Sequence, residues 1–88
     1  MARFLIFHTG SEVIGQEEIV EAARQLQRSL PEGLQWLNSW FVPSEYRMIC
    51  EWEAADKQSL QSFLAQAMPL LPVQVIHEVE PIRPDWYK

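Results

Sequence analysis

The chain has 88 residues, of which 48% are hydrophobic and 22% charged, a composition that fits one globular domain and excludes disordered and fibrous proteins. Its net charge is -5 and its basic residues are scattered, so we expect it to bind neither nucleic acids nor anionic membrane surfaces. A single cysteine excludes an intrachain disulfide, and no apolar run approaches the roughly 20 residues of a membrane-spanning helix, so we expect a cytoplasmic protein.

The first third of the chain predicts a strand followed by a helix. Residues 3–8 form a short apolar run rich in phenylalanine and isoleucine, which is typical of a strand, and a loop follows. From residue 16 or 17 to Leu30 the apolar residues recur at helical spacing. Glu17 and Glu18 lie in the first turn of this helix, where the helix dipole favours anions. Residues 31–33, which include a proline and a glycine, end it.

Residues 36–54 predict a hairpin of two strands around a turn at residues 43–45. Successive side chains of a strand point to opposite faces, so Trp36, Asn38 and Trp40 are expected to share one face. Large apolar side chains fall on both faces of the hairpin. One face can pack against the helices of the chain, and we expect the other to meet water, a ligand or a second copy.

The second half of the chain predicts a helix and a final strand. Asp56 is a good N-cap, and the apolar residues from Leu60 to Met68 recur at helical spacing up to Pro69. Residues 73–79 form a β-branched run that is typical of a strand. Residues 81–88 remain as a C-terminal tail.

The order strand-helix-strand-strand-helix-strand predicts an α+β fold of the ferredoxin-like type in one domain of residues 1–88. Two helices would cover one face of a four-stranded antiparallel sheet. In the first strand, Phe4 and Ile6 oppose Leu5 and Phe7, so this strand is apolar on both sides as well. Burial of a few hundred Å² contributes several kcal/mol at roughly 25 cal/mol per Å². We therefore predict a homodimer packed sheet against sheet, a dimeric α/β barrel.

Several short motifs resemble known families. A family of small bacterial ferredoxin-like proteins, which includes a nickel-binding homodimer, shows Cys-x-aromatic-Glu-Ala, then a helix, then Leu-Pro and Ile-x-Glu-Val. This chain resembles that pattern at residues 50–54, at the helix start at Asp56, at Leu71-Pro72 and at residues 76–79. Residues 31–34 and Ser39-Trp40 are similar to uncharacterised dimeric α/β-barrel proteins. The resemblance implies a ferredoxin-like homodimer with a divalent transition metal such as nickel. The nickel-binding relatives often have a histidine in or near the second helix, and this chain has none there, so only His8 is carried across.

Two histidines are candidate metal ligands. His8 ends the first strand, and His77 lies in the last strand, which pairs beside the first in this fold. If both imidazoles share a face with Glu51, Glu53 or Glu78 nearby, they offer ligands suited to nickel, zinc or iron. The alternative is that each histidine is a strand residue in contact with solvent.

Two glutamates are candidate acid/base groups. Glu51 and Glu53 share one face of a central strand, where charges are costly unless they are paired, hydrated or used. In a sheet-to-sheet dimer they would lie in the cavity between the sheets and act in proton transfer. The alternative is an ion pair with Arg3 or Arg47, or hydration at the mouth of the barrel.

The aromatic residues offer two further sites. Trp36, Trp40 and Trp52 would line a pocket for a flat ligand, or simply belong to the core. Trp86 or Tyr87 of the tail is expected to dock on a neighbouring subunit or over an opening of the barrel, unless the tail is disordered. Cys50 is interpreted as a small buried residue rather than as a reactive thiol.

Our first hypothesis is a cytoplasmic homodimer that binds a small molecule or a metal and catalyses no reaction. The alternatives are a cofactor-independent monooxygenase-like or isomerase-like enzyme that uses the inter-sheet cavity, and a protein-interaction or assembly subunit. The sequence contains no nucleotide-binding loop, nucleophile elbow or metalloprotease motif.

Overall fold

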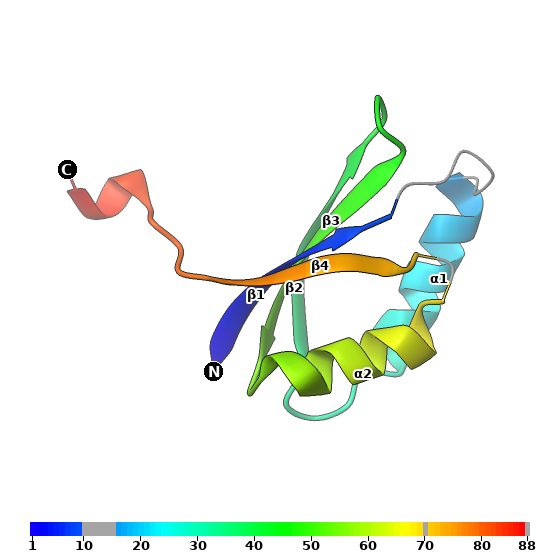
Figure 1. The fold of residues 1–88 in the computed structure, drawn as a ribbon, viewed down its shortest axis with the longest axis horizontal. Coiled ribbons are helices and arrows are strands. Elements are labelled where there is room, and N and C mark those ends of the chain that lie inside the picture. The colour runs from blue at the N-terminus through cyan, green and yellow to red at the C-terminus, as the bar shows by residue number, and fades with distance from the viewer. Residues whose placement is uncertain (10–15, 70, 88) are drawn as a thin grey trace.

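A computed structural model describes residues 1–9, 16–69 and 71–87 of the chain. Four strands and two helices follow one another in the predicted order, and a short 3₁₀ helix lies in the segment predicted as a tail (Figure 1). Their bounds are β1 Ala2–His8, α1 Gln16–Arg28, β2 Gln35–Val42, β3 Arg47–Ala54, α2 Lys57–Ala67, β4 Val73–Val79 and η1 Pro84–Tyr87.

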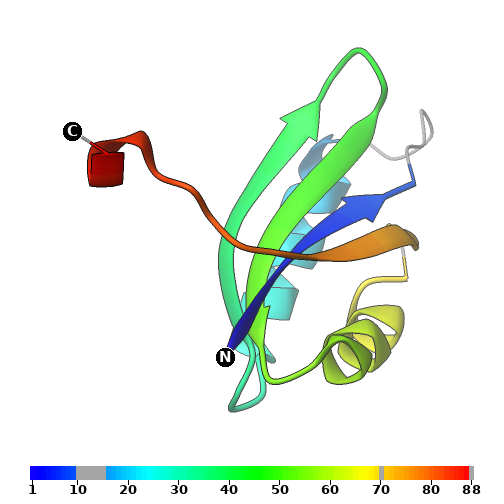
Figure 2. The same ribbon diagram turned by 60° about the vertical axis from the view of Figure 1, so that its left-hand side comes forward.

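The four strands form one sheet in the order β2-β3-β1-β4, and all three pairings are antiparallel. Both helices lie on one side of this sheet (Figures 1 and 2). The prediction of a ferredoxin-like α+β fold with β1 and β3 in the centre is therefore confirmed. The opposite side carries no helix, and we call it the open face.

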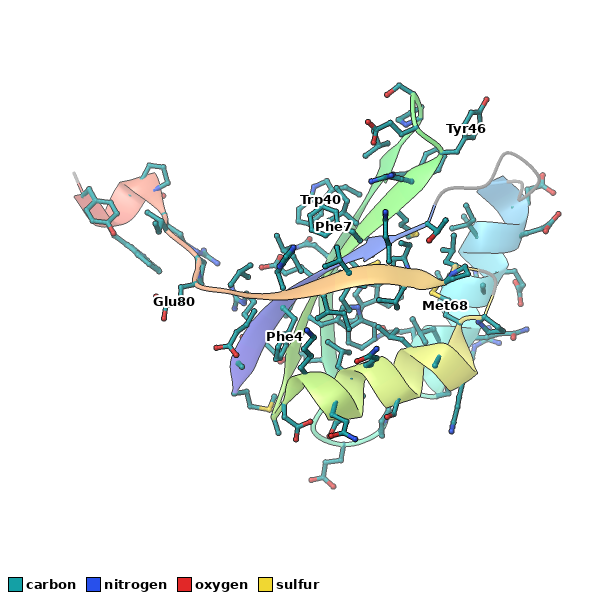
Figure 3. The ribbon with its side chains drawn as sticks, in the orientation of Figure 1. Phe4, Phe7, Trp40, Tyr46, Met68 and Glu80 are labelled. Carbon is teal, nitrogen blue, oxygen red and sulfur yellow. The ribbon has the colours of Figure 1, made fainter. Side chains whose placement is uncertain are left out.

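The burial of β3 shows which residues meet the helices. Met48, Cys50, Trp52 and Ala54 are buried, whereas the residues between them are only partly covered. In β1 the same alternation separates Phe4 from Phe7, which point to opposite sides of the sheet (Figure 3). Even-numbered residues of both central strands thus form the helix-covered face.

The core lies between this face and the two helices. Leu26 of α1 and Leu60 and Leu64 of α2 are buried against the sheet. The large buried side chain there is Trp52, which is 0% exposed. The edge of the Phe63 ring contacts it at a centroid distance of 6.2 Å. The helical spacing seen in the sequence therefore marks the face of each helix that meets the sheet.

Local interactions set the ends of the helices. The carboxylate of Asp56 accepts a hydrogen bond of 2.7 Å from the backbone N–H of Ser59, so this residue is the N-cap of α2 as predicted. The same bond lowers the pKa of Asp56. Helix α1 ends at Arg28, earlier than predicted, and the chain then turns through Gly33 with a φ of 92°. This left-handed conformation is easily accessible to glycine.

A β-bulge in β2 changes one prediction. The register moves from Trp36 opposite Trp52 to Asn38 opposite Glu51, so Leu37 is an extra residue without a partner of its own. Because of this residue, Trp36 lies on the helix-covered side, while Asn38 and Trp40 lie on the open face. The expectation that all three share one face was wrong, since it assumed an unbroken alternation.

The C-terminal residues leave the domain after β4. Residues 80–83 have no regular secondary structure, and η1 forms a single short turn beyond them. This segment projects away from the sheet on the side without helices (Figures 1 and 2). No helix in the described ranges is long and apolar enough to cross a membrane.

Candidate functional site

The open face can be mapped from the register of the four strands. One row across the sheet is apolar, and we call it the apolar row; it consists of Trp40, Ile49, Phe7 and Val75. The neighbouring row is mixed and consists of Asn38, Glu51, Leu5 and His77. Beyond it, Arg3 lies between Glu53 and Val79. Apolar and charged side chains thus occupy opposite ends of one uncovered surface.

The charged end is organised by Arg3. One guanidinium nitrogen donates to Glu53 at 2.7 Å, and another lies 3.4 Å from a carboxylate oxygen of Glu51. The amide of Asn38 donates to Glu51 at 3.0 Å. We call these four residues the charged cluster. The ion pair with Arg3, one of the two partners predicted for these glutamates, is present, whereas Arg47 lies 3.7 Å from Glu45 instead.

The charged cluster is only partly solvated, because the side chains of Arg3, Glu51 and Glu53 are 21%, 17% and 27% exposed. The hydrogen bond to Glu53 raises the pKa of Arg3 above its ordinary value, and the charges of both glutamates add to this effect. Two carboxylates and one guanidinium leave a formal charge of about -1. The cluster therefore favours a cationic group or hydrogen-bond donors in front of it.

His77 is the exposed histidine of the open face. It lies in the edge strand β4, and the ring of Phe7 meets it edge-on at a centroid distance of 6.1 Å. A shallow hollow beside it is lined by Phe7, Arg47, Gln74, Val75 and His77. The imidazole is accessible to a ligand at the edge of the apolar row.

His8 lies on the opposite side of the sheet, where it is fully buried under the helices. Its Nδ1 is 2.8 Å from the carbonyl oxygen of Leu71, so Nδ1 carries a proton and donates. Burial lowers the pKa of His8 and outweighs this hydrogen bond, which acts in the other direction. The side chain is therefore a neutral part of the core.

The structure does not bring the two predicted metal ligands together within one copy. His8 and His77 lie on opposite faces of the sheet, because the register sets Leu5 rather than His8 opposite His77. Among the residues that the structure describes, no group of three or more histidine, cysteine, aspartate or glutamate side chains is placed to hold a metal ion. The donors among these described residues thus do not make a complete transition-metal site, for which about four ligands are usual.

The three tryptophans predicted to line a pocket are also separated. Trp52 is buried, and Trp36 stacks on it with ring centroids 5.9 Å apart and planes 7° from parallel. The indole N–H of Trp36 donates to the hydroxyl of Ser39 at 2.8 Å. Trp40 lies on the other side, half exposed in the apolar row. Trp40 is thus the member of this group that a ligand on the open face can reach.

Cys50 lies in the core, as interpreted from the sequence. It is 2% exposed, and the hydroxyl of Ser39 donates to its sulfur at 3.0 Å. Burial raises the pKa of the thiol to about 11. The thiolate that would act as a nucleophile or metal ligand is therefore scarce at neutral pH.

Sequence reasoning did not identify Asn38 as a partner of Glu51, nor Arg3 as the residue that pairs with both glutamates. The signal for the open face is nevertheless present in the sequence of β3. Charged residues at positions 47, 51 and 53 alternate with the apolar residues 48, 50, 52 and 54. A strand with charges at alternate positions turns those positions away from the helices.

Comparison with known proteins agrees with this architecture. The crystal structure of SCO4226 from Streptomyces coelicolor A3(2) matches with a TM-score of 0.77 and 20% sequence identity, over 93% of this chain and 100% of that chain. At this identity the likeness concerns the fold. No curated protein matches this chain. The profile of the family described as nickel responsive protein SCO4226-like matches residues 4–79, most of the chain. The chain therefore belongs to the SCO4226-like family of nickel responsive proteins.

Proposed function

We propose that this protein is a homodimer in which the open faces of two copies pack together and enclose a small ligand. The observation that carries the proposal is the open face itself, where the apolar row lies uncovered beside the charged cluster. Burial of Trp40, Phe7 and their neighbours by a second copy removes a few hundred Å² of apolar surface from water. At roughly 25 cal/mol per Å² this contributes several kcal/mol, which favours association.

For the ligand, the family description points to a divalent transition metal. His77 is the donor suited to it, because its imidazole is exposed on the open face and imidazole binds nickel, zinc and related ions. The described residues of one copy supply too few donors. A two-fold dimer doubles every donor of the open face, so we propose that His77 of both copies, with carboxylates such as Glu51, completes the site. A metal bound there would act as an ordered charge that joins the two sheets.

The two carboxylates proposed for acid/base chemistry are already engaged by Arg3 and Asn38. A substrate would share these carboxylates with Arg3 and Asn38. The cluster therefore supports a binding role more directly than the enzyme alternative. Its formal charge of about -1 is suited to hold a cationic ligand group in the interface.

Native mass spectrometry of protein purified without chelator tests this function. We expect a dimer that takes up Ni²⁺ when the ion is titrated in, and a His77→Ala variant that remains dimeric but binds Ni²⁺ at least tenfold more weakly. Gln66→Ala is the matched control, because Gln66 is exposed on α2, on the other side of the sheet. Its uptake of Ni²⁺ should equal that of the wild type.

Two outcomes would contradict the proposal in different ways. A wild-type protein that stays monomeric at tens of micromolar would remove the dimer and the enclosed site with it. Equal Ni²⁺ binding by the wild type and His77→Ala would leave the dimer and remove His77 as a metal ligand. A retained organic molecule in the native spectrum would identify a different ligand for the same space.

A further inference from the structure

Residues 80–87 form a C-terminal arm whose trace runs away from the sheet and from both helices (Figures 1 and 2). Its three large apolar side chains are strongly exposed, Ile82 at 75%, Trp86 at 61% and Tyr87 at 71%. The arm also lies beyond the family match, which ends at residue 79. It is therefore a feature of this chain that the family architecture does not explain.

The arm is partly ordered in advance. Pro81 and Pro84 restrict the backbone, and the N–H of Trp86 donates to the carbonyl of Arg83 at 2.9 Å within the turn of η1. A segment that is already restricted loses less conformational entropy when it docks. The two aromatic side chains are thus presented by a short, stiff segment rather than by a random tail.

A second group of exposed aromatic residues lies at the outer end of the β2-β3 hairpin. Phe41 and Tyr46 are 44% and 45% exposed there. Phe41 pairs with Met48 and so lies on the side of the sheet opposite to the open face. Packing of two open faces therefore does not cover Phe41.

The two groups are far apart within one copy. The arm begins at Glu80, and Tyr46 lies at the far end of the hairpin (Figure 3). The register agrees, since β4 ends opposite Arg3, whereas the hairpin turn lies beyond Phe7 at the other end of the sheet. The arm also projects toward the side from which a second copy approaches the open face (Figure 2).

We propose that the arm of each copy docks on the hairpin of the other, with Trp86 and Tyr87 against Phe41 and Tyr46. This inference rests on the proposed homodimer. Five of the eight exposed large apolar side chains of the described residues belong to the arm or to the outer end of the hairpin, and an aromatic side chain buries about 150–250 Å² when covered. Two-fold symmetry makes the exchange reciprocal, so each dimer contains two such contacts.

A double-mutant cycle on the dissociation constant of the dimer tests the arm. Trp86→Ala and Phe41→Ala are each expected to raise this constant about tenfold or more, as truncation of an aromatic anchor at an interface does. The double variant should be weakened by clearly less than the product of the two effects, because both remove the same contact. Sedimentation equilibrium gives the constants, and Gln66→Ala serves as the control with no change.

The outcomes separate the arm from the dimer. A wild-type dimer that Trp86→Ala leaves unchanged, or a cycle with independent effects, would overturn the arm contact while the homodimer stands. A monomeric wild type would overturn both. If Trp86→Ala lowers the melting temperature of the monomer, the arm docks on its own chain and the exchange is wrong. Trp40→Ala, in the apolar row, reports on packing of the open faces independently of the arm.

Discussion

The two faces of the sheet carry the same kinds of residue in different roles. On the helix-covered face, Trp52, Cys50 and His8 are buried together. Nδ1 of His8 donates to a backbone carbonyl, and the sulfur of Cys50 accepts from a hydroxyl group. Nε2 of His8 and the indole nitrogen of Trp52 have no hydrogen-bond partner. On the open face a tryptophan and a histidine are exposed, and charges pair with charges. The residue type therefore says little about function here. The face on which the residue lies decides its role.

The largest test of this difference compares two tryptophans. Trp52→Ala removes a fully buried ring and should lower the free energy of unfolding by about 3–5 kcal/mol. Trp40→Ala removes a half-exposed ring and should change the unfolding of the monomer by less than about 0.5 kcal/mol. Urea unfolding at a concentration that keeps the protein monomeric measures both. Equal losses would mean that the open face is packed as tightly as the core.

A second test concerns His8, the buried histidine of the helix-covered face. The pKa of His8 is lowered in the folded protein, so below its ordinary value of 6.5 the unfolded chain binds a proton that the folded chain does not. Stability should therefore fall as the pH drops below 6.5, by up to about 1.4 kcal/mol per pH unit until His8 is protonated in the folded state as well.

Two variants isolate this effect. His8→Asn keeps a side-chain donor for the carbonyl of Leu71 but does not titrate, so it should lose most of the slope below pH 6.5. Gln66→Ala changes an exposed residue that does not titrate and should retain the wild-type slope. Denaturant unfolding between pH 5 and 7.5 provides the comparison. A slope that persists unchanged in His8→Asn would assign it to other groups.

The smallest expected effect lies in the charged cluster. Arg3→Met leaves Glu51 and Glu53 close together without their shared cation, so we expect a modest loss of stability that added salt reduces by screening the repulsion. Arg47→Met breaks a more exposed contact with Glu45 and should change the melting temperature less. Thermal unfolding at low and high salt distinguishes the two. The reverse order would show that Arg3 does not organise the open face.

Much of the fold was predictable because its signals are local. The helical spacing around Leu60 and Leu64, the cap at Asp56 and the β-branched run of residues 73–79 each depend on neighbours within a few residues. The charges at Glu51 and Glu53 also carried enough information to choose the open face. These elements are specified by the chain over short distances.

The placement of the site depended on longer distances. Whether His8 and His77 share a face is decided by the register between β1 and β4, which no local pattern specifies. The register itself shifts between Phe7 and His8, so counting along the strands does not reveal it. The same reasoning explains why the three tryptophans were grouped together although only Trp40 reaches the open face. Register is a property of two paired strands, so the local pattern of one strand does not reveal it.

The bulge at Leu37 has a consequence for how this protein can change. In a regular strand every second residue faces the core, and the residues between them face the other side along the whole length of the strand. The extra residue separates the two halves of β2. Trp36, before it, packs on the side of the helices, whereas Asn38 and Trp40, after it, lie on the open face. Deleting Leu37 would restore regular alternation and turn the side chains of one half of β2 to the wrong face of the sheet. With Leu37 present, substitutions in the two halves can accumulate independently.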